Sequence, residues 1–280
     1  MASGHPVVLI DSRASDALTD KLADETGIIA LVTDEEPTHK TPYTIVMAKN
    51  LVPDWRDPQT LQTYSRKNGE ETTEKAEDRS DWADHIVLCT SGTTGSSRCY
   101  VHDGKGIAEQ FKCLIPLTED TDRWAREGVR EKTLAFIPWH HVFGFVVSFI
   151  FPLATGNTMI IPAKPSPEAI VQACQESGVT QLIAIPAVWN GIARIVKKRY
   201  VEATEQTEEE FDELIELSLS CQKQGLDLPP MVEGILSIIR SQLFGDALYL
   251  GVSGGGYILP ETLRTINGLG YYLVNGYGMT

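Results

Sequence analysis

Short apolar runs alternate with helix-like segments along most of this chain. Residues 6–10 and 28–32 are apolar, and they flank residues 15–25, which begin with Ser15 or Asp16 as a cap and stop before Gly27. Serine and aspartate are favoured at helix N-caps, and glycine is favoured just past the C-terminal end. A strand–helix–strand unit of this kind joins parallel strands, so residues 6–32 predict a parallel sheet.

The same alternation continues through the second half of the chain. A helix over residues 166–178 begins with a serine–proline pair and ends at a glycine, and one of its faces carries Ile170, Val171 and Cys174. Short apolar strands are typical of parallel sheets that are buried on both faces. The predicted fold class is therefore α/β, with mostly parallel sheets flanked by helices. The further elements expected are strands at residues 86–88, 133–137, 158–161, 181–185 and 247–252, and an apolar helix over 141–153 that is broken near Pro152.

Two polar segments divide the chain. Residues 65–84 are polar and aperiodic, which predicts a surface connection between a β-α-β region at 1–64 and a larger region at 85–280. Residues 194–244 are acidic and have helical periodicity, so we expect a helical insertion there.

Charge and cysteine content exclude several classes of function. The 280 residues carry a formal net charge of −14, whereas a nucleic-acid surface normally needs a basic stripe. Five cysteines without a C-x-x-C pair indicate neither a zinc site nor a disulfide framework, and they favour a reducing, cytoplasmic location. The apolar run at 143–151 is too short to cross a bilayer, and no signal-peptide pattern precedes the first strand. We therefore expect a protein that is not stably inserted in a membrane.

The segment that follows the strand at 86–88 is rich in hydroxyls and glycines and ends with Arg98. Backbone N–H groups, hydroxyls and a guanidinium together suit a polyphosphate, because they place several donors and positive charge in one loop. Clusters of this composition also form plain polar loops, and the pattern is not a Walker loop, which requires a different spacing. The loop alone leaves both interpretations open.

Three motifs, in a consistent order, resemble those of the adenylate-forming superfamily, which includes acyl-CoA synthetases, luciferases and peptide-synthetase adenylation domains. Residues 90–95 read Thr-Ser-Gly-Thr-Thr-Gly and resemble its phosphate loop. Residues 137–144 resemble its Pro-x-x-His-x-x-Gly segment, and residues 253–256 and 275–280 resemble its adenine-pocket segments. The chain therefore resembles part of the large N-terminal AMP-binding domain of such an enzyme, without its C-terminal lid domain.

The resemblance implies roles for the phosphate loop. ATP would be held at its β- and γ-phosphates, with Arg98 at the position where the family usually has lysine. Ser97 and Cys99 also replace a usual proline and glycine, so the affinity of the loop could differ from that of its relatives. The residues implied in phosphate binding are Thr90, Ser91, Gly92, Thr93, Thr94, Gly95 and Arg98.

The resemblance also implies an adenine pocket and a catalytic pair. His141 would lie near the substrate carboxylate, and Thr280 would contact the α-phosphate or Mg²⁺ through its hydroxyl. Tyr277 would stack on adenine while Asn275 binds the edge of the base; the alternative for Tyr277 is an aromatic that fills the core. His140 is expected to be structural, and Trp139 either lines the acyl channel or packs in the core. The remaining pocket residues are Gly255, Gly256, Tyr257, Gly276 and Gly278.

The activity implied is attack of a carboxylate on ATP to form an acyl-adenylate, followed by transfer of the acyl group to coenzyme A. Residues 235–245 resemble a helical segment of long-chain acyl-CoA synthetases, which favours a fatty-acid–CoA ligase. Two alternatives remain: an adenylation domain for amino or aryl acids, and a nucleotide-binding module without catalysis. We expect the isolated 280-residue chain to bind ATP weakly and to form little adenylate, because it lacks the lid.

Overall fold

The computed structural model describes residues 6–33, 41, 44–47, 84–90, 98–119, 131–162 and 164–278. The chain divides into two compact units, Met1–Ala108 and Glu109–Thr280, and each is described by itself. The expected polar connection at 65–84 lies outside the described residues except for Asp84.

The first unit contains two small sheets. Strand β1 (Val7–Leu9) pairs in parallel with β4 (His85–Cys89), and β4 pairs antiparallel with β5 (Cys99–Asp103). A separate two-stranded sheet joins β2 (Ala30–Thr33) to β3 (Thr44–Met47) in parallel. The unit ends within α4 (Gly104–Glu119).

The first predicted strand–helix–strand segment is confirmed in its elements but not in its sheet. Helix α1 (Asp16–Thr26) begins at Ser15, whose hydroxyl accepts a hydrogen bond from the Leu18 amide, and ends at Gly27, which has a φ of +64°. The prediction that β1 and β2 share one sheet is wrong, because each pairs with another strand. The local sequence specifies the strands and the helix, whereas the choice of partner depends on strands much further along the chain.

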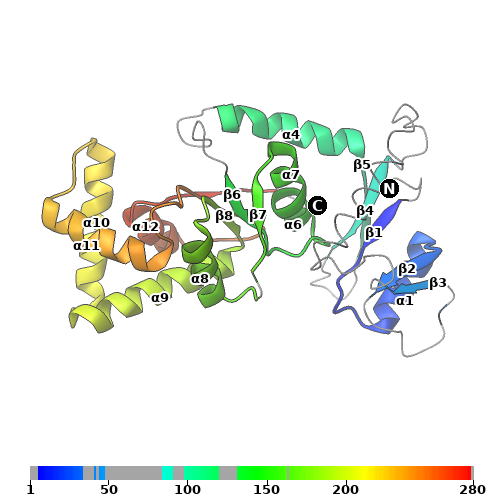
Figure 1. Ribbon diagram of the computed structural model, residues 1–280, viewed down its shortest axis with the longest axis horizontal. Coiled ribbons are helices and arrows are strands. Elements are labelled where there is room, and N and C mark those ends of the chain that lie inside the picture. The colour runs from blue at the N-terminus through cyan, green and yellow to red at the C-terminus, as the bar shows by residue number, and fades with distance from the viewer. Residues whose placement is uncertain are drawn as a thin grey trace, which may run out of the picture. The chain divides into compact units, whose positions relative to one another are not determined.

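The second unit is built on a parallel sheet with the strand order β10-β9-β8-β6-β7 (Figure 1). All four strand pairs in it are parallel. Leu134, Leu182 and Ala184 on the central strands have no exposed surface, as expected for a sheet covered on both faces. The strands are β6 (Lys132–Leu134), β7 (Thr158–Ile160), β8 (Gln181–Ala184), β9 (Leu250–Ser253) and β10 (Tyr272–Asn275).

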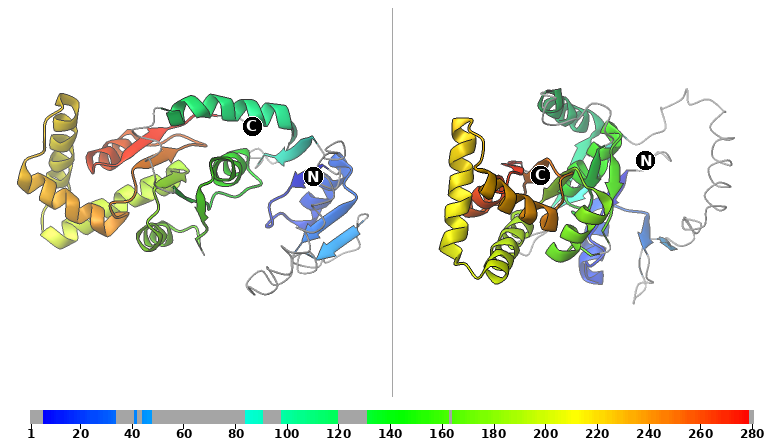
Figure 2. Two further views of the ribbon diagram at one scale, coloured as in Figure 1. Left: turned by 45° about the horizontal axis from the view of Figure 1, so that its top comes forward. Right: turned by 60° about the vertical axis from the view of Figure 1, so that its left-hand side comes forward.

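Helices pack against this sheet, and their side chains form most of the hydrophobic core of the second unit. In Figure 1, α9, α10 and α11 lie together at one end of the unit, and both views of Figure 2 keep them side by side. The predicted helix at 166–178 is confirmed, with Ser166 as its N-cap and Ile170, Val171 and Cys174 buried. The helices are α6 (Val142–Phe145), the π-helix η2 (Val146–Ile150), α7 (Phe151–Thr155), α8 (Pro167–Ser177), α9 (Pro186–Thr204), α10 (Glu208–Gln224), α11 (Pro230–Leu243) and α12 (Pro260–Gly268).

The acidic segment at 194–244 is helical, as predicted, and it contributes directly to the core. Phe211 and Ile215 of α10, with Leu236 and Leu243 of α11, are buried in the same cluster as the sheet residues. Thr207 and Glu210 form a reciprocal capping box at the start of α10. The segment is therefore part of the packed unit and is not a loose excursion from it.

Several predicted boundaries differ from the structure. The strand expected at 133–137 is β6 at Lys132–Leu134, and the strand expected at 28–32 is β2 at Ala30–Thr33. The helix expected at 141–153 continues through Pro152 to Thr155 and ends at Gly156, because a π-helical turn precedes Pro152 and α7 begins at Phe151. Backbone amides in the first turn of a helix have no hydrogen-bond partner within that helix. A proline at such a position therefore causes no loss of a hydrogen bond. The strand expected at 247–252 begins only at Leu250 and ends at Ser253. None of the helices in the described ranges is both long and apolar enough to span a membrane.

Candidate functional site

The predicted motifs of the second unit lie at the carboxyl ends of its parallel strands. The segment 135–144 follows β6, Ile185 and Pro186 follow β8, residues 254–256 follow β9, and residues 276–278 follow β10. In open α/β sheets, ligands bind in the crevice outside the carboxyl ends of the strands. The order of the strands thus brings together motifs that are more than a hundred residues apart in sequence.

The turn that carries His141 is held by backbone hydrogen bonds. The His141 amide donates to the Pro138 carbonyl at 3.2 Å, and the Phe145 amide donates to the His141 carbonyl at 2.8 Å. His141 is the N-cap of α6, but its side chain makes no capping hydrogen bond. Its ring packs against that of His140, with 4.2 Å between the ring centroids. The imidazole of His141 is therefore not used to cap the helix.

Gly144 allows this turn to close. A Cβ atom on Gly144 would lie 2.2 Å from the Pro138 carbonyl oxygen and 2.8 Å from that of Ile137. Both neighbours are backbone atoms, so no side-chain movement can relieve the overlap. The glycine of the Pro-x-x-His-x-x-Gly pattern is thus required for the close approach that positions His141.

We expect Gly144→Ala to lower the free energy of unfolding by about 1–3 kcal/mol, because the methyl group forces the 137–141 backbone to shift. The matched control is Gly234→Ala in α11, where an added Cβ meets nothing within 4 Å. That change should raise stability by about 0.5–1 kcal/mol, since alanine is the better helix former. Urea denaturation of both variants tests the prediction. Equal stability of Gly144→Ala and the unsubstituted protein would contradict the tight turn.

The glycine segment after β9 packs against the residues that follow His141. A Cβ on Gly254 would lie 2.6 Å from the ring of Phe143, and one on Gly255 would lie 3.6 Å from it. Gly255 has a φ of +78°, which few other residues adopt readily. Phe143 was not singled out from the sequence, although its position between His141 and Gly144 is a usable signal. The His141 turn and the predicted adenine segment are therefore in direct contact.

Residues 276–278 join the glycine segment after β9 through the backbone, and that segment is in turn bonded to the end of β8. The Gly276 amide donates to the Ser253 carbonyl at 2.7 Å, and the Gly254 amide donates to the Ala184 carbonyl at 3.2 Å. Tyr277 is 89% exposed and Tyr257 is 75% exposed. The alternative in which Tyr277 fills the core is therefore wrong. Asn275, Gly276 and Gly278 are also exposed, so these residues are open to a ligand at the edge of the sheet.

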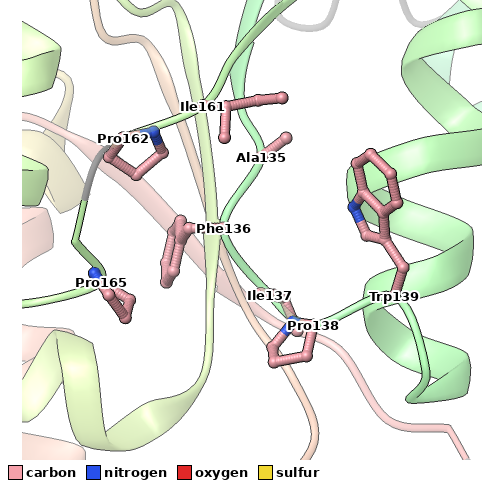
Figure 3. Close-up of a pocket in the computed structure, with 8 residues that line it drawn as sticks. All are labelled: Ala135, Phe136, Ile137, Pro138, Trp139, Ile161, Pro162 and Pro165. Carbon is pink, nitrogen blue, oxygen red and sulfur yellow. The ribbon is translucent and has the colours of Figure 1, made fainter. Parts of the chain in front are cut away.

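An apolar pocket of about 260 Å³ lies beside the His141 turn (Figure 3). Phe136 points toward the side of the pocket formed by Pro162 and Pro165, and Trp139 lies on the opposite side (Figure 3). Trp139 is 39% exposed and stacks on Phe149 of η2 with 4.7 Å between the ring centroids. Trp139 therefore lines a pocket and is not a core residue. The pocket is lined by Ala135, Phe136, Ile137, Pro138, Trp139, Ile161, Pro162 and Pro165.

Only the two ends of the predicted phosphate loop can be described, and they belong to the first unit. The Thr90 amide donates to the Arg98 carbonyl at 2.9 Å, and the Arg98 amide donates to the Thr90 hydroxyl at 3.1 Å. These bonds extend the β4–β5 ladder by one pair, and the Arg98 side chain is exposed. The other predicted residues, Ser91, Gly92, Thr93, Thr94, Gly95 and Thr280, lie outside the described residues.

Among the residues that the structure describes, no group of three or more histidine, cysteine, aspartate or glutamate side chains could hold a metal ion. Mg²⁺ prefers oxygen ligands at close to octahedral geometry. We therefore derive no step through a metal from these residues.

The comparisons with known proteins agree with one another on the family. The family model for AMP-binding enzymes matches residues 1–280. The sulfoacetate–CoA ligase of Cupriavidus necator is 29% identical over 103 residues, which are 37% of this chain and 19% of that protein. The 4-coumarate–CoA ligase of Halorhodospira halophila is 27% identical over 113 residues, which are 40% of this chain and 26% of that protein. The matched part of this chain thus spans about a quarter or less of the length of these relatives.

Solved structures agree on the fold. A malonyl-CoA ligase in a ternary product complex with methylmalonyl-CoA and AMP matches 99% of this chain and 47% of its own, with a TM-score of 0.59 and 18% identity. The N-terminal subdomain of Klebsiella oxytoca NpsA with 3-hydroxyanthranilyl-AMSN matches 98% of this chain and 54% of its own, with a TM-score of 0.58 and 14% identity. The predicted α/β class with parallel sheets flanked by helices is confirmed, and the chain belongs to the AMP-binding enzyme family.

Proposed function

We propose that the intact protein is an ATP-dependent acid–thiol ligase. A carboxylate oxygen attacks the α-phosphorus of ATP, which releases pyrophosphate and leaves an acyl-adenylate. The thiol of coenzyme A then attacks the acyl carbonyl, which releases AMP and forms a thioester. The observation that carries this proposal is the convergence of the His141 turn, residues 254–256 and residues 276–278 at one edge of the sheet.

The main barrier to this reaction is the meeting of two anions, so donors must neutralise oxygen atoms where charge develops. In our proposal, the phosphate loop at 90–95 and Arg98 bind the β- and γ-phosphates, and His141 donates to the substrate carboxylate or to the adjacent phosphate oxygen. Tyr277 stacks on adenine beside Gly255, Gly256 and Tyr257, and Asn275 binds the edge of the base. The Thr280 hydroxyl contacts the α-phosphate or the Mg²⁺ that would neutralise it.

We assign the apolar pocket beside Trp139 to the acyl group. Its lining residues carry no charged side chain, so an ammonium or a second carboxylate would lose hydration there without gaining a partner. A fatty acid is the substrate class that fits best. At about 260 Å³ the pocket lies below the roughly 300–1,000 Å³ usual for small-molecule sites, so a long acyl chain would extend beyond it. We place the reaction in the cytoplasm on the basis of the cysteine content.

Pyrophosphate exchange tests this proposal with four acids: octanoate, palmitate, benzoate and leucine. We expect the intact protein to exchange pyrophosphate with octanoate and palmitate at least about tenfold faster than with leucine, because the charged amino group cannot be solvated in an apolar pocket. Coenzyme A should then convert the adenylate to a thioester. Exchange with leucine or benzoate alone, without conversion of the adenylate to a coenzyme A thioester, would instead indicate an adenylation domain. Binding of ATP without exchange for any acid would indicate a nucleotide-binding module.

A further inference from the structure

Two cysteines face each other where the β4–β5 hairpin opens into the predicted phosphate loop. Cys89 is the last residue of β4, Cys99 is the first residue of β5, and the two are register partners. Their sulfur atoms are 3.3 Å apart. Cys99, which stands where the family usually has glycine, therefore has a specific neighbour.

The hairpin ladder gives these two residues a backbone geometry suited to a disulfide. The Gly104 amide bonds to the Asp84 carbonyl and the Thr90 amide bonds to the Arg98 carbonyl, so these pairs are hydrogen-bonded pairs. Because hydrogen-bonded and non-hydrogen-bonded pairs alternate along antiparallel strands, Cys89 and Cys99 form a non-hydrogen-bonded pair. In such pairs the Cα atoms lie about 4.5 Å apart, which is within the roughly 4.4–6.8 Å spanned by disulfides.

The two thiols differ in their access to solvent. Cys89 is buried, whereas Cys99 is partly exposed. Burial raises the pKa of the Cys89 thiol to about 12, and the neighbouring Cys99 adds to this increase. Since the thiolate is the reacting species and Cys89 is buried, the partly exposed Cys99 is the sulfur that an external reagent meets first.

We propose that Cys89 and Cys99 are a disulfide-forming pair that undergoes reversible thiol–disulfide exchange with a small-molecule disulfide such as oxidised glutathione. The bond would join the two strand ends that bear Thr90 and Arg98. This modification site is independent of the function proposed above, because it rests on the hairpin alone.

The exchange proceeds in two balanced steps. The Cys99 thiolate attacks one sulfur of oxidised glutathione, the glutathione disulfide breaks, and one glutathione leaves as a thiolate. The Cys89 sulfur, after its proton passes to solvent, then attacks the Cys99 sulfur and releases the second glutathione. The two cysteines lose two electrons in total, and oxidised glutathione gains them to become two molecules of the thiol.

Peptide mapping tests the proposal with the intact protein. Trypsin cleaves after Arg98 and Lys105, so Cys89 and Cys99 fall on separate peptides, and a disulfide would join the peptides at 80–98 and 99–105. After incubation with oxidised glutathione under native conditions, we expect this linked pair of peptides, and dithiothreitol should separate it. The predominant product should carry no glutathione at either cysteine.

Two serine variants provide the controls. Cys99→Ser should abolish the loss of free thiols at Cys89, whereas Cys221→Ser, at a partly exposed cysteine of α10, should leave the linked pair unchanged. A stable glutathione adduct on Cys99 with Cys89 still free would overturn the proposal. Equal oxidation of Cys89 in the Cys99→Ser variant would also overturn it.

Discussion

Replacing His141 by alanine in the intact protein is expected to slow adenylate formation by about 10²–10³-fold, the usual cost of removing one donor from a site where negative charge develops. The loss should appear in kcat for pyrophosphate exchange, while the affinity for ATP changes less, because in the proposed reaction this donor acts on charge that develops in the transition state. The side chain makes no capping bond to α6, so its removal should leave the helix start intact.

Two neighbouring substitutions separate this role from a structural one. His141→Gln keeps a side-chain donor and should retain part of the lost rate. His140→Ala removes the adjacent ring, which packs 4.2 Å from that of His141, and should cause a much smaller loss. If His140→Ala and His141→Ala reduced the rate equally, the assignment of the donor to His141 would fail.

Replacing Trp189 by alanine is expected to lower the free energy of unfolding of the second unit by about 3–5 kcal/mol. Trp189, in α9, has no exposed surface, and its indole N–H donates to the Val252 carbonyl of β9 at 3.1 Å. The ring also packs edge-on against Phe244, with 6.1 Å between the ring centroids. A cavity would result and the indole hydrogen bond would be lost, a large effect for a domain stabilised by only about 5–15 kcal/mol.

Two matched changes make the Trp189 prediction specific. Trp189→Phe keeps an aromatic ring but loses the hydrogen bond, so it should cost less than the alanine variant. Trp139→Ala deletes the same side chain where it is 39% exposed, and it should cost much less than Trp189→Ala. Urea denaturation of the three variants gives the comparison. A similar loss at Trp139 and Trp189 would mean that burial does not determine the effect.

Local sequence signals predicted individual elements well because their physical basis is local. Ser166 and Gly178 act within one turn of the ends of α8, and Ser15 and Gly27 do the same for α1. The acidic segment at 194–244 is likewise helical because periodicity and the Thr207–Glu210 capping box operate over a few residues. The strands β3, β5 and β10 and the helices α4 and α12 were not predicted. For the strands the reason is that a run of four or five residues carries little periodicity.

The motifs located His141, Gly254 and Tyr277 in the sequence, and Gly144 could be read there as part of a pattern. The sequence by itself therefore determined the fold class, most helices and the family. Only the tertiary structure decided that β1 pairs with β4, that Phe143 fits against Gly254, that Tyr277 is exposed and that Cys89 meets Cys99. The physical reason is that pairing and packing depend on residues far apart in the chain, whereas propensity and capping depend only on neighbours.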